Sequence, residues 1–286
     1  MTDRPLSDWL RDATACLARV SDTPRLDAEL LAAFALGLSR EEMILGLPRL
    51  DAPPVVEALI ARRLAHEPLA YILGKRDFWT LSLRVTPAVL IPRPDSETLI
   101  EAAIGHFQDR APPRRILDLG TGSGALLLAA LDIWPEATGL GIDASPAAIE
   151  IARENAVICA MADRATFRVG DWGAGIAERF DLILCNPPYI STRAMLPADV
   201  RDHEPASALF AGEDGLDDYR RLATQTGALL AEGGVAIFEI GFDQAESAGA
   251  LFRAAGFAVR LARDLAGRAR ALIVTAGSRV ADTEAP

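Results

Sequence analysis

The chain has 286 residues, of which 50% are apolar and 24% charged, a composition that indicates a globular protein and excludes a disordered one. Its net charge of −11 argues against a surface built mainly to hold nucleic acid, because neutralising phosphates requires clustered Lys and Arg. The longest unbroken aliphatic stretch, residues 125–131, is too short to span a bilayer. We therefore expect neither a membrane partner nor stable nucleic-acid binding.

Cysteine spacing and the first residues favour the cytoplasm. Cys16, Cys159 and Cys185 stand far apart without C-x-x-C spacing, as expected for buried thiols in a reducing compartment. Residues 1–5 lack the basic and then apolar pattern of a secretory signal. The three histidines lack metal-ligand spacing, so we expect no metal site and, for His106 among them, a surface or capping role.

Residues 1–73 carry helical patterns and no convincing strand. Apolar residues recur at three- and four-residue spacings in segments 6–20, 27–37, 40–46 and 54–66. Because helices of this length are marginal alone, we expect them to pack as a small bundle.

Residues 74–92 are richer in strand-forming side chains, including Phe78 and Trp79, and predict a β-hairpin linker. Residues 92–97 then interrupt the strand pattern, and Asp95 or Ser96 is the expected cap of a helix that runs through residue 106.

From residue 114 onward, strand and helix patterns alternate, and residues 93–277 are expected to form one domain. Strands are expected at 114–119, 138–142, 166–169, 180–185, 235–240, 258–262 and 271–275, and helices at 125–133, 146–159, 217–231 and 243–255. The alternation predicts a doubly wound α/β sheet of seven strands with right-handed crossovers. Residues 278–286 are read as a polar tail.

The first of these strands runs into a glycine-rich loop and then a helix: Gly120-Thr121-Gly122-Ser123-Gly124. Alternate glycines let the backbone turn tightly and approach a ligand, at the strand end where α/β sheets bind ligands. The spacing also satisfies G-x-G-x-x-A, which leaves a dinucleotide site open. No Gly-Lys-Ser/Thr follows, which excludes a phosphate loop.

The next two strand ends carry acidic residues. Asp143 can take both ribose hydroxyls of a nucleoside, or it can cap the helix that opens at Ser145. Asp171 and Trp172 follow the third strand, where the acid can bind an adenine amino group and the indole can cover a base. A Trp at a strand end is, however, a core or rim residue about as often.

Asn186-Pro187-Pro188-Tyr189 follows the fourth strand. Two prolines cannot donate to a ladder, and the first restricts Asn186 to extended backbone, so the chain leaves the sheet stiffly. Such a corner can aim two neutral acceptors, the side-chain oxygen of Asn186 and the carbonyl of Pro187, at one planar NH2 group. A strand-ending turn remains the plain alternative for the tetrapeptide alone.

Read in order, these strand ends resemble the class I S-adenosylmethionine-dependent methyltransferases, in the branch that methylates planar NH2 groups. A dehydrogenase has no evident use for the fourth element. Adenine N6, cytosine N4 and glutamine N5 are the candidate acceptors, since each nitrogen lone pair is delocalised.

Stretches outside the tetrapeptide favour glutamine. Residues 66–74, 78–79 and 90–97 closely resemble signature stretches of the PrmC/HemK family, and further agreement lies at 204–209, 214–220, 239–241 and 264–267. The resemblance extends from the helical segments to about residue 275. It departs at Ser96, where Thr is common, but both residues cap helices.

The resemblance implies a protein-(glutamine-N5) methyltransferase that uses S-adenosyl-L-methionine, releases S-adenosyl-L-homocysteine and needs no metal. The implied substrate is the glutamine of the Gly-Gly-Gln loop in class 1 peptide chain release factors, with residues 1–73 helping to dock it. A DNA or RNA amino methyltransferase, acting on adenine N6 or cytosine N4, is the alternative.

Site roles follow from the same resemblance. Residues 120–124 would cradle the methionine part of the cofactor, Asp143 would hold the ribose and Trp172 would flank the adenine. Asp171 would contact the adenine amino group. Residues 186–189 would hold the substrate amide, with Asn186 bridging cofactor and substrate and Tyr189 walling the pocket. The sequence leaves open whether Glu204 and Glu239 support the pocket or only the fold.

Overall fold

A computed structural model describes residues 4–277, which divide into two compact units. The first contains the described residues up to Lys75 together with Leu196–His203. The second contains Arg76–Met195 and the described residues from Glu204 onward. The described part of the chain contains no helix whose length and hydropathy would let it cross a bilayer.

The first unit is helical. Its helices are α1 (Leu6–Leu17), α2 (Pro24–Leu36), α3 (Arg40–Gly46), α4 (Val55–Leu64), α5 (Leu69–Leu73) and α9 (Ala198–His203), with a short 3-10 turn at Leu47–Arg49. The four predicted helical segments are confirmed, whereas α5 and α9 were not expected. Both are shorter than seven residues, too short for a helical period to stand out in the sequence.

The core of this unit forms because apolar residues line one side of each helix. In α1 the buried positions include Leu6, Trp9, Leu10 and Leu17, the spacing of one helical face. A capping box at Ser39 starts α3. A buried ion pair also links α4 to α2: Nε of Arg63 donates to the Asp27 carboxylate over 2.9 Å.

The predicted hairpin is present but shorter than residues 74–92: β1 (Lys75–Phe78) and β2 (Leu81–Arg84) form a two-stranded sheet. The chain then runs irregularly to a 3-10 turn at Pro94–Ser96 and helix α6 (Glu97–Phe107). Ser96 precedes α6 as predicted, but its hydroxyl makes no cap hydrogen bond. That hydroxyl donates to Glu239 instead.

The second unit is built on one sheet, whose seven strands in the described residues are β3 (Arg115–Leu119), β4 (Thr138–Asp143), β5 (Ala165–Val169), β6 (Phe180–Cys185), β7 (Leu230–Glu239), β8 (Phe257–Arg263) and β9 (Ala269–Ala276). Their order across the sheet is β5-β4-β3-β6-β7-β9-β8. Five strands pair in parallel, from β5 to β7, while β9 runs antiparallel to both of its neighbours. The predicted doubly wound α/β sheet is confirmed.

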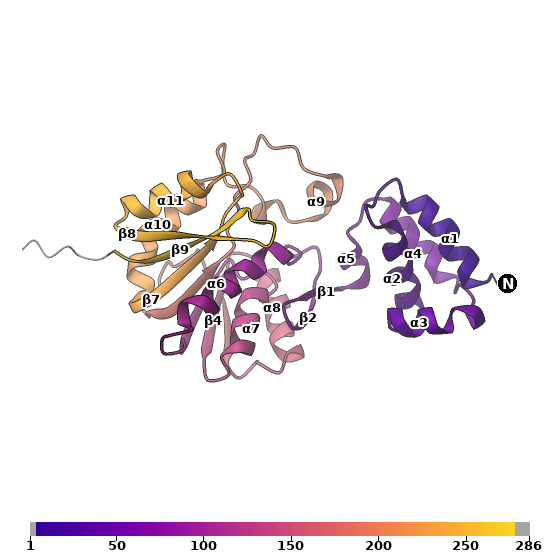
Figure 1. Cartoon of the computed structure of the whole chain (residues 1–286), viewed down its shortest axis with the longest axis horizontal. Coiled ribbons are helices and arrows are strands. Elements are labelled where there is room, and N and C mark those ends of the chain that lie inside the picture. Colours follow the sequence, from indigo (N-terminus) through magenta and orange to yellow (C-terminus); the bar gives the residue numbers. More distant parts are fainter. Residues whose placement is uncertain (1–3, 278–286) are drawn as a thin grey trace, which may run out of the picture. The chain divides into compact units, whose positions relative to one another are not determined.

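Helices cover both faces of this sheet (Figure 1). Helices α6, α7 (Ala125–Ile133) and α8 (Pro146–Ile158) share one buried cluster, and α10 (Asp217–Leu229) and α11 (Ala245–Ala254) share another. Strand β6 shows why two layers form. Leu182 and Leu184 face the first cluster and Ile183 and Cys185 the second, because successive side chains of a strand point to opposite faces.

The strand order places a topological switch between β3 and β6. From β3 the chain moves outward to β4 and β5, and then returns to β6 on the other side of β3. Crossovers on the two sides lie on opposite faces, so a crevice opens beyond the carboxyl ends of β3 and β6. The glycine-rich loop follows β3 and the Asn-Pro-Pro-Tyr corner follows β6, so the fold brings both to this crevice.

Candidate functional site

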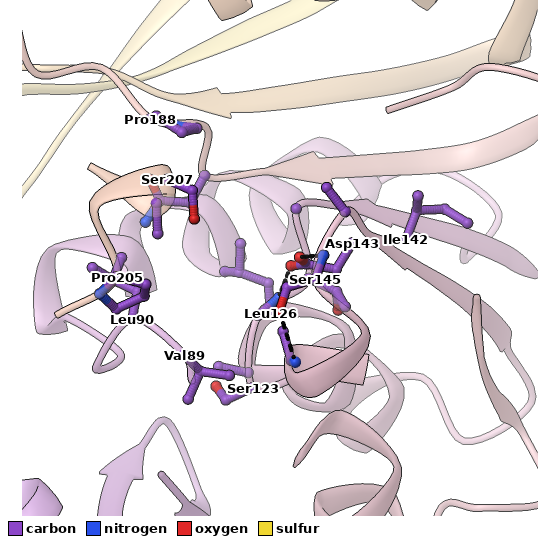
Figure 2. Close-up of a pocket in the computed structure, with 18 of the residues that line it drawn as sticks. Val89, Leu90, Ser123, Leu126, Ile142, Asp143, Ser145, Pro188, Pro205 and Ser207 are labelled. Atoms are coloured by element: carbon purple, nitrogen blue, oxygen red, sulfur yellow. Dashed lines mark hydrogen bonds between the residues drawn. The ribbon is translucent and has the colours of Figure 1, made fainter. Parts of the chain in front are cut away.

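A cavity of about 330 Å³ lies at this end of the sheet, a size typical of small-molecule sites. Its walls come from the second unit alone: the segment after β2, the glycine-rich loop, the ends of β4, β5 and β6, and the first turn of α10. In the view of Figure 2, Leu90, Pro188 and Ser207 lie on one side of the hollow and Asp143 and Ser145 on the other.

The glycine-rich loop lines the cavity with residues Gly120, Thr121, Gly122 and Ser123. Backbone N–H groups of Gly120 and Thr121 both donate to the carbonyl of Ile142 on β4, at 2.8 and 2.9 Å, which fixes the loop to the sheet. Gly120 has a φ of 71°, and a Cβ there would lie 3.2 Å from the Trp172 ring. The glycine therefore allows both the turn and the close approach of the indole.

Asp143 is half-buried and lines the cavity beside the glycine-rich loop. Its two carboxylate oxygens accept from the N–H groups of Gly122 and Ser145, each at 2.9 Å. The cap of α8 is the hydroxyl of Ser145, which accepts from Ala148 at 3.2 Å. Asp143 is thus not the side chain that caps this helix, and its remaining lone pairs are available to hydroxyl donors in the cavity.

Trp172 and Asp171 follow β5 and both line the cavity, but they are held differently. Trp172 has a φ of 50°, and its Nε1 donates to Asp218 over 3.2 Å. The exposed Asp171 carboxylate is paired with Arg221 of α10, so it is not free for an amino group alone. Asp218 was missed by sequence reasoning, although two aspartates open the predicted helix at 217; burial raises the pKa of its carboxyl.

The corner after β6 presents acceptors. Asn186 and Pro188 line the cavity, while Pro187 is buried. Among residues 4–277, none donates a hydrogen bond to Oδ1 of Asn186 or to the Pro187 carbonyl oxygen. Tyr189, which was expected to wall the pocket, is not among the lining residues; its hydroxyl donates to Oε1 of Glu239 over 3.1 Å.

A buried carboxyl stands behind this corner. Nδ2 of Asn186 donates to the hydroxyl of Ser96 over 3.2 Å, and that hydroxyl donates to Oε2 of Glu239. Burial raises the pKa of Glu239 to about 7, although the hydrogen bonds from Ser96 and Tyr189 lower it. Burial, and then the charge of Glu239, raise the pKa of Tyr189 as well.

Glu204 fixes another wall. Residues 88–90 and Pro92 line the cavity, and Glu204 accepts both from the N–H of Ile91, at 3.2 Å, and from the guanidinium of Arg93. Sequence reasoning left the role of Glu204 open and did not place the 88–92 segment at the site. The only signal was the family resemblance of residues 90–97.

The expected surface or capping role of His106 is wrong. The side chain is 7% exposed, and neither ring nitrogen has a hydrogen-bond partner in the described residues. Burial, which disfavours the imidazolium, lowers its pKa. Within residues 4–277 no group of three or more His, Cys, Asp or Glu side chains is arranged to hold a metal ion.

The residues present fit a nucleoside that carries an amino-acid tail. A carboxylate with free lone pairs, an indole face and a glycine-rich backbone surround one hollow, and Asn186, whose side-chain oxygen is uncommitted, borders it. Such a set can hold a sugar and a base, and it can orient a second molecule that donates two N–H bonds.

Known proteins resemble this chain in both units. Residues 8–74 match the PrmC N-terminal domain and residues 112–236 match a methyltransferase domain. The release factor glutamine methyltransferase of Rhodospirillum rubrum is 45% identical over 258 residues, covering 88% of this chain and 79% of that protein. The enzyme of the same name from Vibrio cholerae is 41% identical and covers 93% of each chain.

A solved structure, the ribosomal protein L11 methylase of Lactobacillus delbrueckii, supports the fold. It is 23% identical, with a TM-score of 0.50, over 68% of this chain and 85% of that one. The sequence relatives go further, because their identity extends over both units. The chain therefore belongs to the release factor glutamine methyltransferase family.

Proposed function

We propose that the protein transfers a methyl group from S-adenosyl-L-methionine to the side-chain amide nitrogen of a glutamine, the Gly-Gly-Gln glutamine of a class 1 peptide chain release factor. The observation that carries this proposal is the pair of unpaired acceptors at the corner after β6, Oδ1 of Asn186 and the carbonyl of Pro187. Because the proposed substrate acts in translation, we also propose the cytoplasm as the compartment of the reaction.

An amide nitrogen is a poor nucleophile because its lone pair is delocalised into the carbonyl. Two acceptors set off the amide plane draw the NH2 hydrogens toward them, which turns the lone pair out of conjugation. The cofactor, when bound, supplies an electrophilic methyl group on a sulfonium. Asn186 and Pro187 thus orient and polarise the acceptor nitrogen, an effect that grows toward the transition state.

The cofactor would be held by the residues that surround the cavity. Residues 120–124 would cradle its methionine part, and Asp143 would accept from the ribose hydroxyls. Trp172 would flank the adenine, with its indole held by Asp218 at 3.2 Å. Asp171 is proposed for the adenine amino group, beside its ion pair with Arg221. The chain needs no strong base, since a methylated, cationic amide nitrogen loses its proton readily.

The same acceptors give specificity. Glutamate would bring oxygens, not N–H groups, against Oδ1 of Asn186 and the Pro187 carbonyl, and all of them would stay unpaired. Sites that hydrogen-bond a substrate group reject analogues without it by roughly 10⁴-fold or more.

The helical unit is proposed to help recognise the release factor. Its second and third helices expose apolar side chains that its own core does not use, among them Leu26, Phe34, Ile44 and Leu45. Exposed apolar groups of this kind are typical of surfaces that bind a macromolecule.

One competition assay tests the function. The enzyme and labelled S-adenosylmethionine are incubated with a Gly-Gly-Gln release factor and duplex DNA in the same tube. We expect label in the protein, and mass spectrometry should place it on the Gly-Gly-Gln glutamine. A release factor with glutamate at that position is the control and should stay unlabelled. Label in the DNA alone would reject the proposal in favour of a nucleic-acid amino methyltransferase.

A further inference from the structure

A chain of three buried or half-buried polar groups leads away from the cavity. Asn186 and Ser96 line the cavity, and Glu239 lies behind them; Ser96 is 4% exposed and Glu239 is 1% exposed. Nδ2 of Asn186 donates to Ser96 Oγ, and Ser96 Oγ donates to Oε2 of Glu239. They come from three separate segments: Ser96 from the turn before α6, Asn186 from the corner after β6, and Glu239 from the end of β7.

The direction of each hydrogen bond follows from the protonation state of Glu239, the group farthest from the cavity. An ionised carboxylate only accepts, and a hydroxyl has one hydrogen. While Glu239 is ionised, the hydrogen of Ser96 is used toward it, so Ser96 can only accept from Asn186. The NH2 end of the Asn186 side chain is thereby held at Ser96, and its oxygen is left for the substrate.

We propose that Ser96 and Glu239 are positioning residues that fix the orientation of the Asn186 carboxamide, and that an ionised Glu239 is required for the productive orientation. The inference rests on the proposed function, since it concerns which end of Asn186 the substrate amide meets. Glu239 is not among the residues that line the cavity, and both residues are proposed to act through Asn186.

Protonation of Glu239 reverses the direction of the hydrogen bonds that link Glu239, Ser96 and Asn186. A neutral carboxyl can donate to Ser96, whose own hydrogen then turns to Asn186 and favours the opposite rotamer. The amide NH2 of Asn186 would then face the substrate NH2, donor against donor. The groups that face Glu239 are Asp95 beside Ser96, Tyr189 after β6, Cys185 of β6, Tyr219 of α10 and Arg270 of β9.

These neighbours set the pKa of the Glu239 carboxyl near neutral pH. Arg270 and the hydroxyl donors favour the ionised form, whereas burial and Asp95 oppose it, which supports a pKa of about 7. Arg270 is itself shared, since it pairs with Asp95 at 2.9 Å and with Asp264 at 3.3 Å. Turnover should therefore rise with pH as Glu239 ionises.

The first test compares Ser96→Ala with Ser96→Thr, which keeps the hydroxyl. At saturating substrates we expect Ser96→Ala to lower kcat by about tenfold, the effect of one lost positioning hydrogen bond. Its affinity for S-adenosylhomocysteine should stay within about twofold, since the cofactor contacts are intact. Ser96→Thr should retain kcat. Equal kcat in Ser96→Ala and Ser96→Thr would overturn the inference.

The second test uses Glu239→Gln, which cannot ionise. In the wild type, kcat should rise between about pH 6 and pH 8, and Glu239→Gln should lack this limb. The side-chain NH2 signals of Asn186 in nitrogen-15-labelled protein, assigned by their loss in Asn186→Ala, should titrate over the same range without cofactor. The titration should disappear in Glu239→Gln.

The nuclear magnetic resonance readout separates the two proposals. Absence of methyl transfer by the wild type, with an Asn186 signal that titrates, would reject the proposed function and keep the orientation switch. Methyl transfer whose pH limb and Asn186 titration both persist in Glu239→Gln would reject the switch and keep the function.

Discussion

Two side chains of the site differ in how much of their hydrogen-bonding capacity the protein itself uses. Both oxygens of Asp143 already accept backbone N–H groups, so this residue shapes the loop as well as offering lone pairs. Asn186 uses only its side-chain NH2 group in a hydrogen bond within the protein, and its side-chain oxygen accepts none from the described residues. Substitution of Asp143 should therefore weaken cofactor binding, whereas substitution of Asn186 should slow turnover.

For Asn186→Ala we expect kcat to fall by about 10²–10³, the usual cost of deleting one aimed polar group. Binding of S-adenosylhomocysteine should change little, because the cavity walls at residues 120–123 and at Asp143 remain. Single-turnover kinetics and calorimetry check the two halves. Full activity in this variant would refute the acceptor role of Asn186.

For Asp143→Ala we expect the Kd of S-adenosylhomocysteine to rise by about 10- to 100-fold, since charge-assisted hydrogen bonds are worth roughly 1.5–3 kcal/mol each. Asp143→Asn keeps one acceptor and should lie between this variant and the wild type. Titration calorimetry measures the Kd values, and unchanged binding in Asp143→Ala would contradict the ribose assignment.

At the scale of elements, the irregular segment between β2 and α6 is a cavity wall that owes its shape to one carboxylate. Glu204 satisfies the N–H of Ile91 and the guanidinium of Arg93 while being almost fully buried. A wall without regular secondary structure has few ladder hydrogen bonds of its own. Its order therefore depends on such side-chain anchors.

Glu204→Ala should lower the free energy of unfolding by about 1–3 kcal/mol, because it leaves buried donors unpaired. The matched control is Glu213→Ala, which breaks the exposed Arg193–Glu213 pair and should cost about 0–1 kcal/mol. Urea unfolding of both variants measures the difference. Equal costs would mean that Glu204 is not an anchor of this segment.

The sequence predicted most of these elements because their apolar periods are long and regular. Helix α7 and strand β6 lie at the predicted bounds. The antiparallel direction of β9 was not predicted, although only five residues separate β8 from β9, too few for a parallel crossover. The paired acceptors were predicted from the two prolines, but the contact between Ser96 and Glu239 was not, because it joins residues 143 positions apart.

At the scale of the whole molecule, burial and ion pairing shift the pKa values of carboxyl groups in opposite directions. In the second unit burial raises the pKa of Asp118 to about 7, as it does for Glu239. In the helical unit a hydrogen bond from Arg62 lowers the pKa of Glu67. A carboxyl whose pKa is raised by folding stabilises the fold below its unfolded pKa, and this stabilisation is lost as pH rises through the folded pKa of about 7. A carboxyl whose pKa is lowered by folding stabilises the fold above its unfolded pKa, and this stabilisation is lost as pH falls through the folded pKa.

We expect Asp118→Asn to flatten the pH dependence of the second unit. The wild-type free energy of unfolding should contain contributions from Asp118 and Glu239 that are present near pH 5 and are lost by about pH 8, and the variant should keep only that of Glu239. Hydrogen exchange of β3 and β6 amides at the two pH values reports on this unit. Glu67→Gln, in the other unit, is the control and should leave the exchange of these amides unchanged.

Helix α9 gives the helical unit a discontinuous sequence. It groups with the amino-terminal residues, while Met195 before it and Glu204 after it group with the sheet. The polypeptide passes from one unit to the other three times, after Lys75, after Met195 and after His203. A transplant of the helical unit from a relative must therefore carry two stretches, and a protein truncated at residue 75 would lack part of that unit.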